Sequence, residues 1–179
     1  ESQRLMDDLV DLETEAIERI LNKVATDDEP QNIKEVEKET WELLLKTGKE
    51  GRRTGLGFTA LADMIAALGF SIDSDEAIAF VEKIMKEKCR AEFDCSIDMS
   101  LERGSFVGFN KEIENSSEFV QMLKQELPTV YDRMMKFGRR NISISTVAPT
   151  GTLSMLAQTS SGIEPVFMTH YKRRRKLNE

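Results

Sequence analysis

The chain has 179 residues, a formal charge of −7 and a pI of about 5.0. This length allows one domain with a sizeable buried core. The acidic balance argues against a protein that wraps nucleic acid, because binding to phosphates needs a clustered basic surface, and the one basic run, residues 172–176, is typical of a solvated terminal segment. No stretch approaches the roughly 20 apolar residues of a membrane span and no signal peptide is recognisable, so we expect a cytoplasmic protein without a membrane partner.

Cysteine and histidine are too sparse to suggest thiol or metal chemistry. Cys89 and Cys95 are the only cysteines, and their spacing fits neither a CxxC redox pair nor a four-ligand zinc site. His170 is the single histidine. We therefore interpret both thiols as buried or incidental, and we predict neither a catalytic residue nor a metal site in this chain.

Helical periodicity dominates the first three quarters of the sequence. Apolar side chains recur every three or four positions over residues 4–24, with acidic residues between them, which predicts an amphipathic helix. A polar turn at residues 26–30 separates this helix from a second one, which starts near Ile33 and which Gly48 can end. The chain therefore opens with a predicted helix pair.

A glycine turn and two further helices are predicted next. Residues 51–57 contain three glycines, which favour a tight turn. The stretch 58–68 is apolar nearly all round, which predicts a buried helix with Gly69 at its C-terminal cap. Asp73 and Glu76 have the spacing of a capping box and predict the start of a long helix.

The pattern changes from helical to extended at Arg140. Before that residue, the predicted elements are a break at residues 104–110, a helix capped by Ser116 or Ser117 and running through Leu123, and a helix from Pro128 to Gly138. After it, Ile142, Ile144 and Thr146 alternate with other side chains. This period of two predicts a strand with one face on a core.

A turn and a helix start follow that predicted strand, in the sequence Ala148-Pro149-Thr150-Gly151-Thr152-Leu153-Ser154. A helix that begins near Thr152 directs unpaired N–H groups and the positive end of its dipole toward the loop, where an anion can sit. The hydroxyls of Thr150, Thr152 and Ser154 are further donors, and Gly151 has no side chain to block a phosphate. The loop has no lysine, so it is not the GxxxxGK[ST] loop of nucleotide triphosphatases. The same residues also suit an ordinary turn with a Thr or Ser N-cap, so local chemistry leaves both interpretations open.

Three blocks around this loop resemble the large subunit of ribonucleotide reductases. They are Arg140-Asn141, the loop at residues 148–154, and residues 160–167 with the sequence Ser-Ser-Gly-Ile-Glu-Pro-Val-Phe. Residues 51–57 resemble a preceding block of the same family, and residues 5–13 resemble its coenzyme B12-dependent branch. The Ala-Pro-Thr-Gly-Thr form of the loop also favours that branch over the iron-dependent one. The likeness covers essentially the whole chain.

The resemblance implies an α/β fold class. The chain would be a mostly helical fragment of a ten-stranded α/β barrel, with a strand–loop–helix phosphate site near its C-terminus. Residues 1–179 would form one partial catalytic-barrel domain, with a mainly helical scaffold over residues 1–138 and the strand, phosphate loop, helix and following turn over residues 139–179. The implied substrate-phosphate site consists of Thr150, Gly151, Thr152 and Ser154, with Ala148 and Pro149 as framework and Leu153 as a backbone donor.

The activity implied by the resemblance is the radical reduction of ribonucleotides to deoxyribonucleotides for DNA synthesis. The family's radical cysteine lies in an Asn-x-Cys-x-Glu block, which does not occur here. Because the chain also begins with Glu1, we interpret it as an internal fragment and expect it to be inactive alone. For the parent enzyme the resemblance implies adenosylcobalamin, a thioredoxin-type reductant, the remainder of the barrel and a homodimer, with cofactor contacts largely outside this span and none on this fragment.

Several charged residues near these blocks have expected structural roles. Arg52 and Arg53 could meet a phosphate or an internal carboxylate, and an ion pair is the more common outcome for arginine beside a helix. Arg140 and Asn141 are expected to orient the predicted strand and the loop. Glu164 is expected to be a structural carboxylate bonded to backbone N–H groups.

Two other functions remain compatible with the residues. A non-catalytic helical interaction module would explain the amphipathic helices and the acidic surface, and it predicts no anion preference at residues 148–154. An unrelated enzyme that holds a phosphorylated small molecule at the same helix start predicts phosphate binding without preference for nucleotides. Calorimetry with phosphate and with nucleoside diphosphates and triphosphates separates these functions from a ribonucleotide site.

Overall fold

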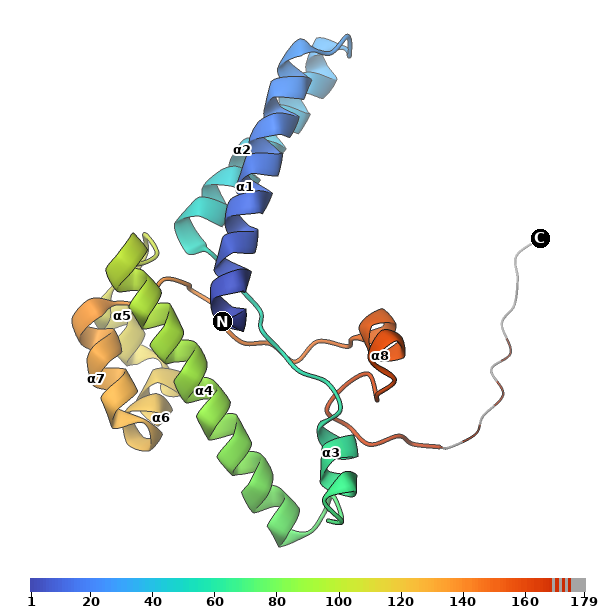
Figure 1. Cartoon of the computed structure of the whole chain (residues 1–179). Helices are drawn as coiled ribbons and strands as arrows, with labels where there is room; N and C mark the ends of the chain where they lie inside the picture. The colour runs from blue at the N-terminus through green and yellow to red at the C-terminus, as the bar shows by residue number, and fades with distance from the viewer. Residues whose placement is uncertain (169, 171, 173, 175–179) are drawn as a thin grey trace. The chain divides into compact units, whose positions relative to one another are not determined.

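The computed structural model describes residues 1–168, 170, 172 and 174, and these residues form eight helices (Figure 1). The helices are α1 (Ser2–Thr26), α2 (Gln31–Gly51), α3 (Leu61–Ala67), α4 (Asp75–Arg103), α5 (Lys111–Ser116), α6 (Glu118–Glu126), α7 (Pro128–Phe137) and α8 (Gly151–Ala157). None of these helices is long and apolar enough to cross a membrane. Within the predicted basic tail, residues 173, 175 and 176 lie outside the described residues.

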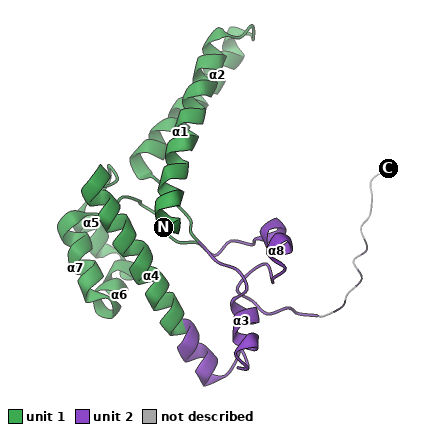
Figure 2. Ribbon diagram, in the orientation of Figure 1, with its two compact units in different colours: residues 1–56, 82–146 green, residues 57–81, 147–179 purple. Residues whose placement is uncertain are grey.

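The chain divides into two compact units, shown in different colours in Figure 2. Unit 1 combines residues 1–56 with residues 82–146, and unit 2 combines residues 57–81 with the described residues from 147 onward. Each unit is therefore built from two separate stretches of sequence. Helix α4 begins in unit 2 and continues into unit 1.

Helices α1 and α2 form the predicted helix pair in unit 1 (Figure 1). Val10, Ile17 and Val24 are buried at seven-residue spacing on α1, which is the stripe expected of an amphipathic helix. The prediction that Gly48 ends α2 is wrong, because the helix continues to Gly51. A Cβ built on Gly48 would lie 3.8 Å from a methyl of Thr14, an ordinary van der Waals distance, so this glycine neither stops the helix nor is needed for the packing of α1.

The main apolar core of unit 1 lies between α4, α6, α7 and the chain after α7. Its buried members are Phe93, Ile97, Val120, Leu123, Val130, Met134 and Ile144. Pro128 in the first turn of α7 and Gly138 at its C-cap, with φ of 78°, confirm the predicted ends of that helix. Helix α5 was not predicted, and it starts where the Asn110 side chain accepts hydrogen bonds from two backbone N–H groups.

Unit 2 has a smaller core, made by Leu61, Ile65 and Ala77. The helix predicted over residues 58–68 is shorter, because Ala60 has a φ of 63° that no helical residue adopts, so α3 starts at Leu61. It is also buried on one side only, since Met64 and Leu68 are exposed. Gly69, with φ of 81°, follows the last turn as predicted.

The start of α4 differs from the predicted capping box. The Ala77 N–H donates to the Ser74 hydroxyl at 3.2 Å, so Ser74 caps the helix rather than Asp73. The carboxylate of Asp73 accepts a hydrogen bond from Ser71 instead. Sequence reasoning missed Ser74, which directly follows Asp73 and whose hydroxyl reaches the first turn.

The described residues contain no β-strand, so the prediction of a strand over residues 140–147 is wrong for this structure. The segment is extended and pairs in parallel with residues 54–56 through a single bridge, between Leu56 and Ser145. Only one neighbouring segment pairs with it, so no ladder develops. Ile144 still faces the core, as the alternation predicted, whereas Thr146 is exposed.

Candidate phosphate-binding loop

The loop predicted to bind phosphate lies in unit 2 and leads into α8. The helix begins at Gly151, one residue before the predicted start, with Thr150 as its N-cap. Among the described residues, no acceptor lies within hydrogen-bond distance of the N–H groups of Gly151, Thr152 and Leu153. These three residues are exposed, so the first turn offers three unpaired amides to solvent.

Two of the three hydroxyls predicted to face an anion are used within the chain. The Thr150 N–H and hydroxyl both donate to the Ser161 carbonyl, at 3.0 and 2.6 Å. The hydroxyl of Ser154, which is 4 % exposed, donates to the Gly151 carbonyl at 2.9 Å. These two side chains therefore fix the loop, and the donors that remain toward solvent are the three amides and the exposed Thr152 hydroxyl.

Residues 159–167 connect the loop to the α3 region. Their hydrogen bonds to the α3 region join the Ala60 N–H to the Gly162 carbonyl at 2.9 Å, the Ser160 N–H to the Asp63 carboxylate at 2.8 Å, and the hydroxyls of Thr59 and Thr159 at 3.0 Å. Because Ser161 holds Thr150, these bonds link the loop to α3 within unit 2. The bonding of Glu164 to backbone N–H groups stays a prediction.

Unit 1 contains a buried charge cluster at the block that carries Arg52. The carboxylate of Asp7, which is fully buried, accepts hydrogen bonds from Arg52 Nε and Asn141 Nδ2, both at 2.8 Å. Arg103 and Arg140 approach its other oxygen at 3.3 and 3.4 Å. The predicted ion-pair role of Arg52 is therefore confirmed, whereas Arg53 is exposed.

Asn141 is the centre of this cluster and is fully buried. Its Nδ2 donates to Asp7 and to the Arg52 carbonyl, and its Oδ1 accepts from Ser96 and Gln3. These bonds fix Asn141 within unit 1, and its predicted role in orienting the loop stays a prediction. Sequence reasoning missed its partners Gln3 and Asp7, although both lie on the face of α1 that carries its buried apolar stripe.

The acidic residues beside Asn141 do not form a convincing cation site. Ligand atoms of Asp7, Asp8 and Asp11 lie within 4.8 Å of one another. Arg52 pairs with the first and third of these carboxylates, and Arg103 pairs with the first and second. The arginines already balance the negative charge that would attract a metal ion.

The Asp7 carboxyl predicts a pH-dependent stability. Burial alone would raise its pKa, but hydrogen bonds from Arg52 and Asn141 and the charges of Arg52 and Arg140 outweigh burial and hold the pKa below its ordinary value of 3.8. The unfolded chain then binds the proton more readily, so this stabilisation is present above pH 3.8 and is lost as pH falls below 3.8 through the lowered pKa. Urea unfolding across that pH range should show this loss, and Asp7→Asn should remove this part of the pH dependence.

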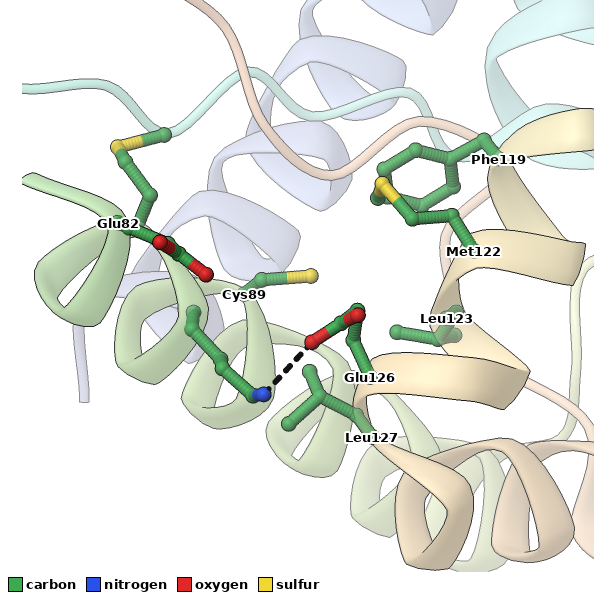
Figure 3. Close-up of a pocket in the computed structure, with 9 residues that line it drawn as sticks. Glu82, Cys89, Phe119, Met122, Leu123, Glu126 and Leu127 are labelled. Carbon is green, nitrogen blue, oxygen red and sulfur yellow. Dashed lines mark hydrogen bonds and ion pairs between the residues drawn. The ribbon is translucent and has the colours of Figure 1, made fainter. Parts of the chain in front are cut away.

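A separate apolar hollow lies between α4 and α6 in unit 1 (Figure 3). It measures about 400 Å³, and Phe119, Met122 and Leu127 line it. Lys86 and Glu126 form an ion pair of 2.7 Å at its edge. Burial raises the pKa of the Cys89 thiol in this hollow, which disfavours the reactive thiolate.

The described residues thus form a helical scaffold followed by a hydrogen-bonded turn and a helix with an exposed start. Residues 3–179 match the family described as ribonucleotide reductase, barrel domain. The chain therefore belongs to this family, which confirms the resemblance noted in the sequence.

Individual relatives agree with the family match. A vitamin B12-dependent ribonucleoside-diphosphate reductase of Mycobacterium tuberculosis is 34% identical over 68% of this chain. An enzyme of the same name from Thermoplasma acidophilum is 31% identical over 74% of the chain, and a ribonucleoside-diphosphate reductase subunit alpha of Treponema pallidum is 27% identical over 70%. The matched region is 15% of the length of each relative. The predicted likeness to the B12-dependent branch is thus confirmed.

Proposed function

We propose that this chain is the segment of a cytoplasmic, vitamin B12-dependent ribonucleoside-diphosphate reductase that holds the phosphate groups of its substrate. Both units would belong to one partial barrel domain, and residues 148–154 would be the phosphate loop. The observation that carries this proposal is the set of three unpaired, exposed amides at Gly151, Thr152 and Leu153, in a chain that matches the reductase family.

The chemistry of the loop suits a phosphate rather than a neutral ligand. Unpaired amides at a helix start carry partial positive charge, and an anion satisfies several of them at once. Apart from its chain neighbours and the backbone of α8, no atom of the described residues lies within 4 Å of a Cβ built on Gly151, so the space beside these amides is open to a phosphate oxygen. The loop would therefore bind and orient the nucleotide, while the sugar reacts at residues supplied by the rest of the reductase.

The residues described here do not fit the cofactor. Adenosylcobalamin supplies the radical when it is bound to the parent enzyme. The hollow between α4 and α6 and three others formed by described residues of unit 1 measure about 290 to 540 Å³, which suits a drug-sized molecule and not a corrinoid several times larger. We assign no cofactor contact and no reaction step to these cavities. The thioredoxin-type reductant and the homodimer likewise belong to our proposal for the parent enzyme.

Substitutions at Gly151 test the phosphate loop directly. Glu and Gln have nearly the same size, and both fit the open space beside Gly151, so they differ in charge alone. In the full-length reductase, Gly151→Glu should raise the KM for a nucleoside diphosphate about tenfold above Gly151→Gln, because a carboxylate within a few ångströms repels the phosphate. Steady-state kinetics of both variants measures this difference.

Binding measurements on the same variants separate the proposal from the two rival functions. Calorimetry should show weaker binding of the diphosphate to Gly151→Glu, with little change for the nucleoside that lacks phosphate. Equal binding of inorganic phosphate and diphosphate would favour a general phosphate site. Identical kinetics and binding for Gly151→Glu and Gly151→Gln would contradict the proposed loop. That result is the one expected of the interaction module, which has no anion preference at residues 148–154.

A further inference from the structure

Two extended segments run side by side in unit 1 just before the chain enters unit 2. The Leu56 N–H donates to the Ile144 carbonyl at 2.9 Å, and the Thr146 N–H donates to the Leu56 carbonyl at 3.1 Å. The next residues along the chain, Gly57 and Val147, begin the two stretches of unit 2. The phosphate loop starts at Ala148, three positions after Ser145 in the parallel bridge.

This pairing is too short to be stable by itself. It has one bridge and no continuing ladder, and even a complete two-stranded ribbon is only marginally stable in water. Thr146 and Ser145 are also exposed, so apolar burial does not hold the end of the segment. Thr54 holds the segments two residues earlier, because its N–H and its hydroxyl both donate to the Ser143 carbonyl at 2.9 Å, so a further contact is of most use at Leu56 and Ser145.

Lys88 on α4 contacts both segments at that point. Its ammonium group donates to the Leu56 carbonyl at 3.1 Å, to the Ser145 hydroxyl at 2.5 Å and to the Glu92 carboxylate at 2.5 Å. An ammonium group has three N–H donors, so these three acceptors match its capacity. The Ser145 hydroxyl in turn donates to the Leu56 carbonyl at 3.3 Å, so the two segments are joined to each other and to α4.

The surroundings make these contacts stronger than an ordinary surface pair. The side chains of Lys88 and Glu92 are 16% and 5% exposed. Charge-assisted hydrogen bonds in a partly buried setting are stronger and more directional than neutral ones. Glu92 lies one helical turn from Lys88 and pairs with its ammonium group at 2.5 Å, which holds the Lys88 side chain beside the two segments.

We propose that Lys88 is a positioning residue for substrate binding, because it fixes the end of the segment that leads into the phosphate loop. This inference rests on the proposed function of residues 148–154. Lys88 acts through the backbone at Leu56 and Ser145 and needs no contact with the nucleotide. Glu92 and Ser145 complete the arrangement.

The test uses the full-length reductase with Lys88→Met, Lys88→Arg and Ser145→Ala. Met keeps the length of the side chain and removes its charge and donors, so the KM for a nucleoside diphosphate should rise about tenfold while kcat stays within about twofold. Lys88→Arg should show a much smaller rise in KM than Lys88→Met, because arginine keeps the charge and donates several hydrogen bonds. Ser145→Ala should give a smaller rise in KM in the same direction, and it leaves α4 untouched if Lys88→Met folds poorly.

Hydrogen exchange measured by mass spectrometry gives a readout that does not depend on activity. In Lys88→Met, peptides that cover residues 143–154 should exchange faster than in the parent, while peptides from α1 should not change. Unchanged exchange in residues 143–154 would overturn the inference. The inference would also be overturned if Lys88→Met exchanged faster but kept its KM, while Gly151→Glu raised the KM. If neither Lys88→Met nor Gly151→Glu alters the KM, the proposed phosphate loop itself fails and the positioning role fails with it.

Discussion

Replacement of Asp7 by alanine should lower the free energy of unfolding of unit 1 by about 3–5 kcal/mol, because it leaves the buried Arg52 with only the half-exposed Asp11 as its counter-charge. The Asp7 side chain is fully buried and the Arg52 side chain is 7% exposed, so water cannot replace the lost contact. Asn141 would also lose an acceptor. Urea unfolding followed by the fluorescence of Trp41, the single tryptophan and part of unit 1, measures the change.

An exposed ion pair from the same helix provides the control for Asp7. Arg4 pairs with Glu102 at 2.6 Å, but both side chains are largely exposed, and such pairs contribute little to stability. Arg4→Ala should therefore leave the urea midpoint nearly unchanged. Equal effects of Asp7→Ala and Arg4→Ala would show that burial of the Asp7 cluster contributes nothing.

Replacement of Ile97 by alanine should cost about 2–5 kcal/mol, because it removes three methyl or methylene groups from a closed core and leaves a cavity. Ile97 has no exposed surface and packs among the side chains of α6 and α7. Thermal or urea unfolding of the variant measures the loss. The same helix supplies the control one turn later, where Leu101 is 57% exposed, so Leu101→Ala should have a far smaller effect. A loss at Leu101 as large as that at Ile97 would place the core elsewhere.

The sequence predicted most helices because their signals are local. The amphipathic stripe of α1 and the Pro128 and Gly138 ends of α7 depend on residues within a few positions of one another. The end of α2 could not be predicted in this way. A single glycine only weakens a helix, and Gly48 lies against Thr14 of α1, a tertiary contact that no local pattern reveals.

In the candidate site, too, local features could be predicted from the sequence and tertiary contacts could not. The turn at Thr150 and the start of α8 are encoded in adjacent residues, so the loop could be found from the sequence. The use of the Thr150 hydroxyl by Ser161 depends on the chain folding back, which no local pattern reveals. The predicted strand was wrong for a related reason. Alternation such as that of Ile142 and Ile144 indicates which side of an extended segment is buried, whereas a β-ladder also requires neighbouring segments to pair with it.

The spacing of the residues around Asn141 also bears on how the chain acquires its structure. Arg52 and Asp7 are 45 positions apart, whereas Asn141 and Asp7 are separated by 134. Closing the longer loop costs more chain entropy and slows folding, so the α1–α2 pair can form early and Asn141 joins late. During synthesis, the Asp7–Arg52 pair would thus lack its Asn141 partner until residue 141 has been made.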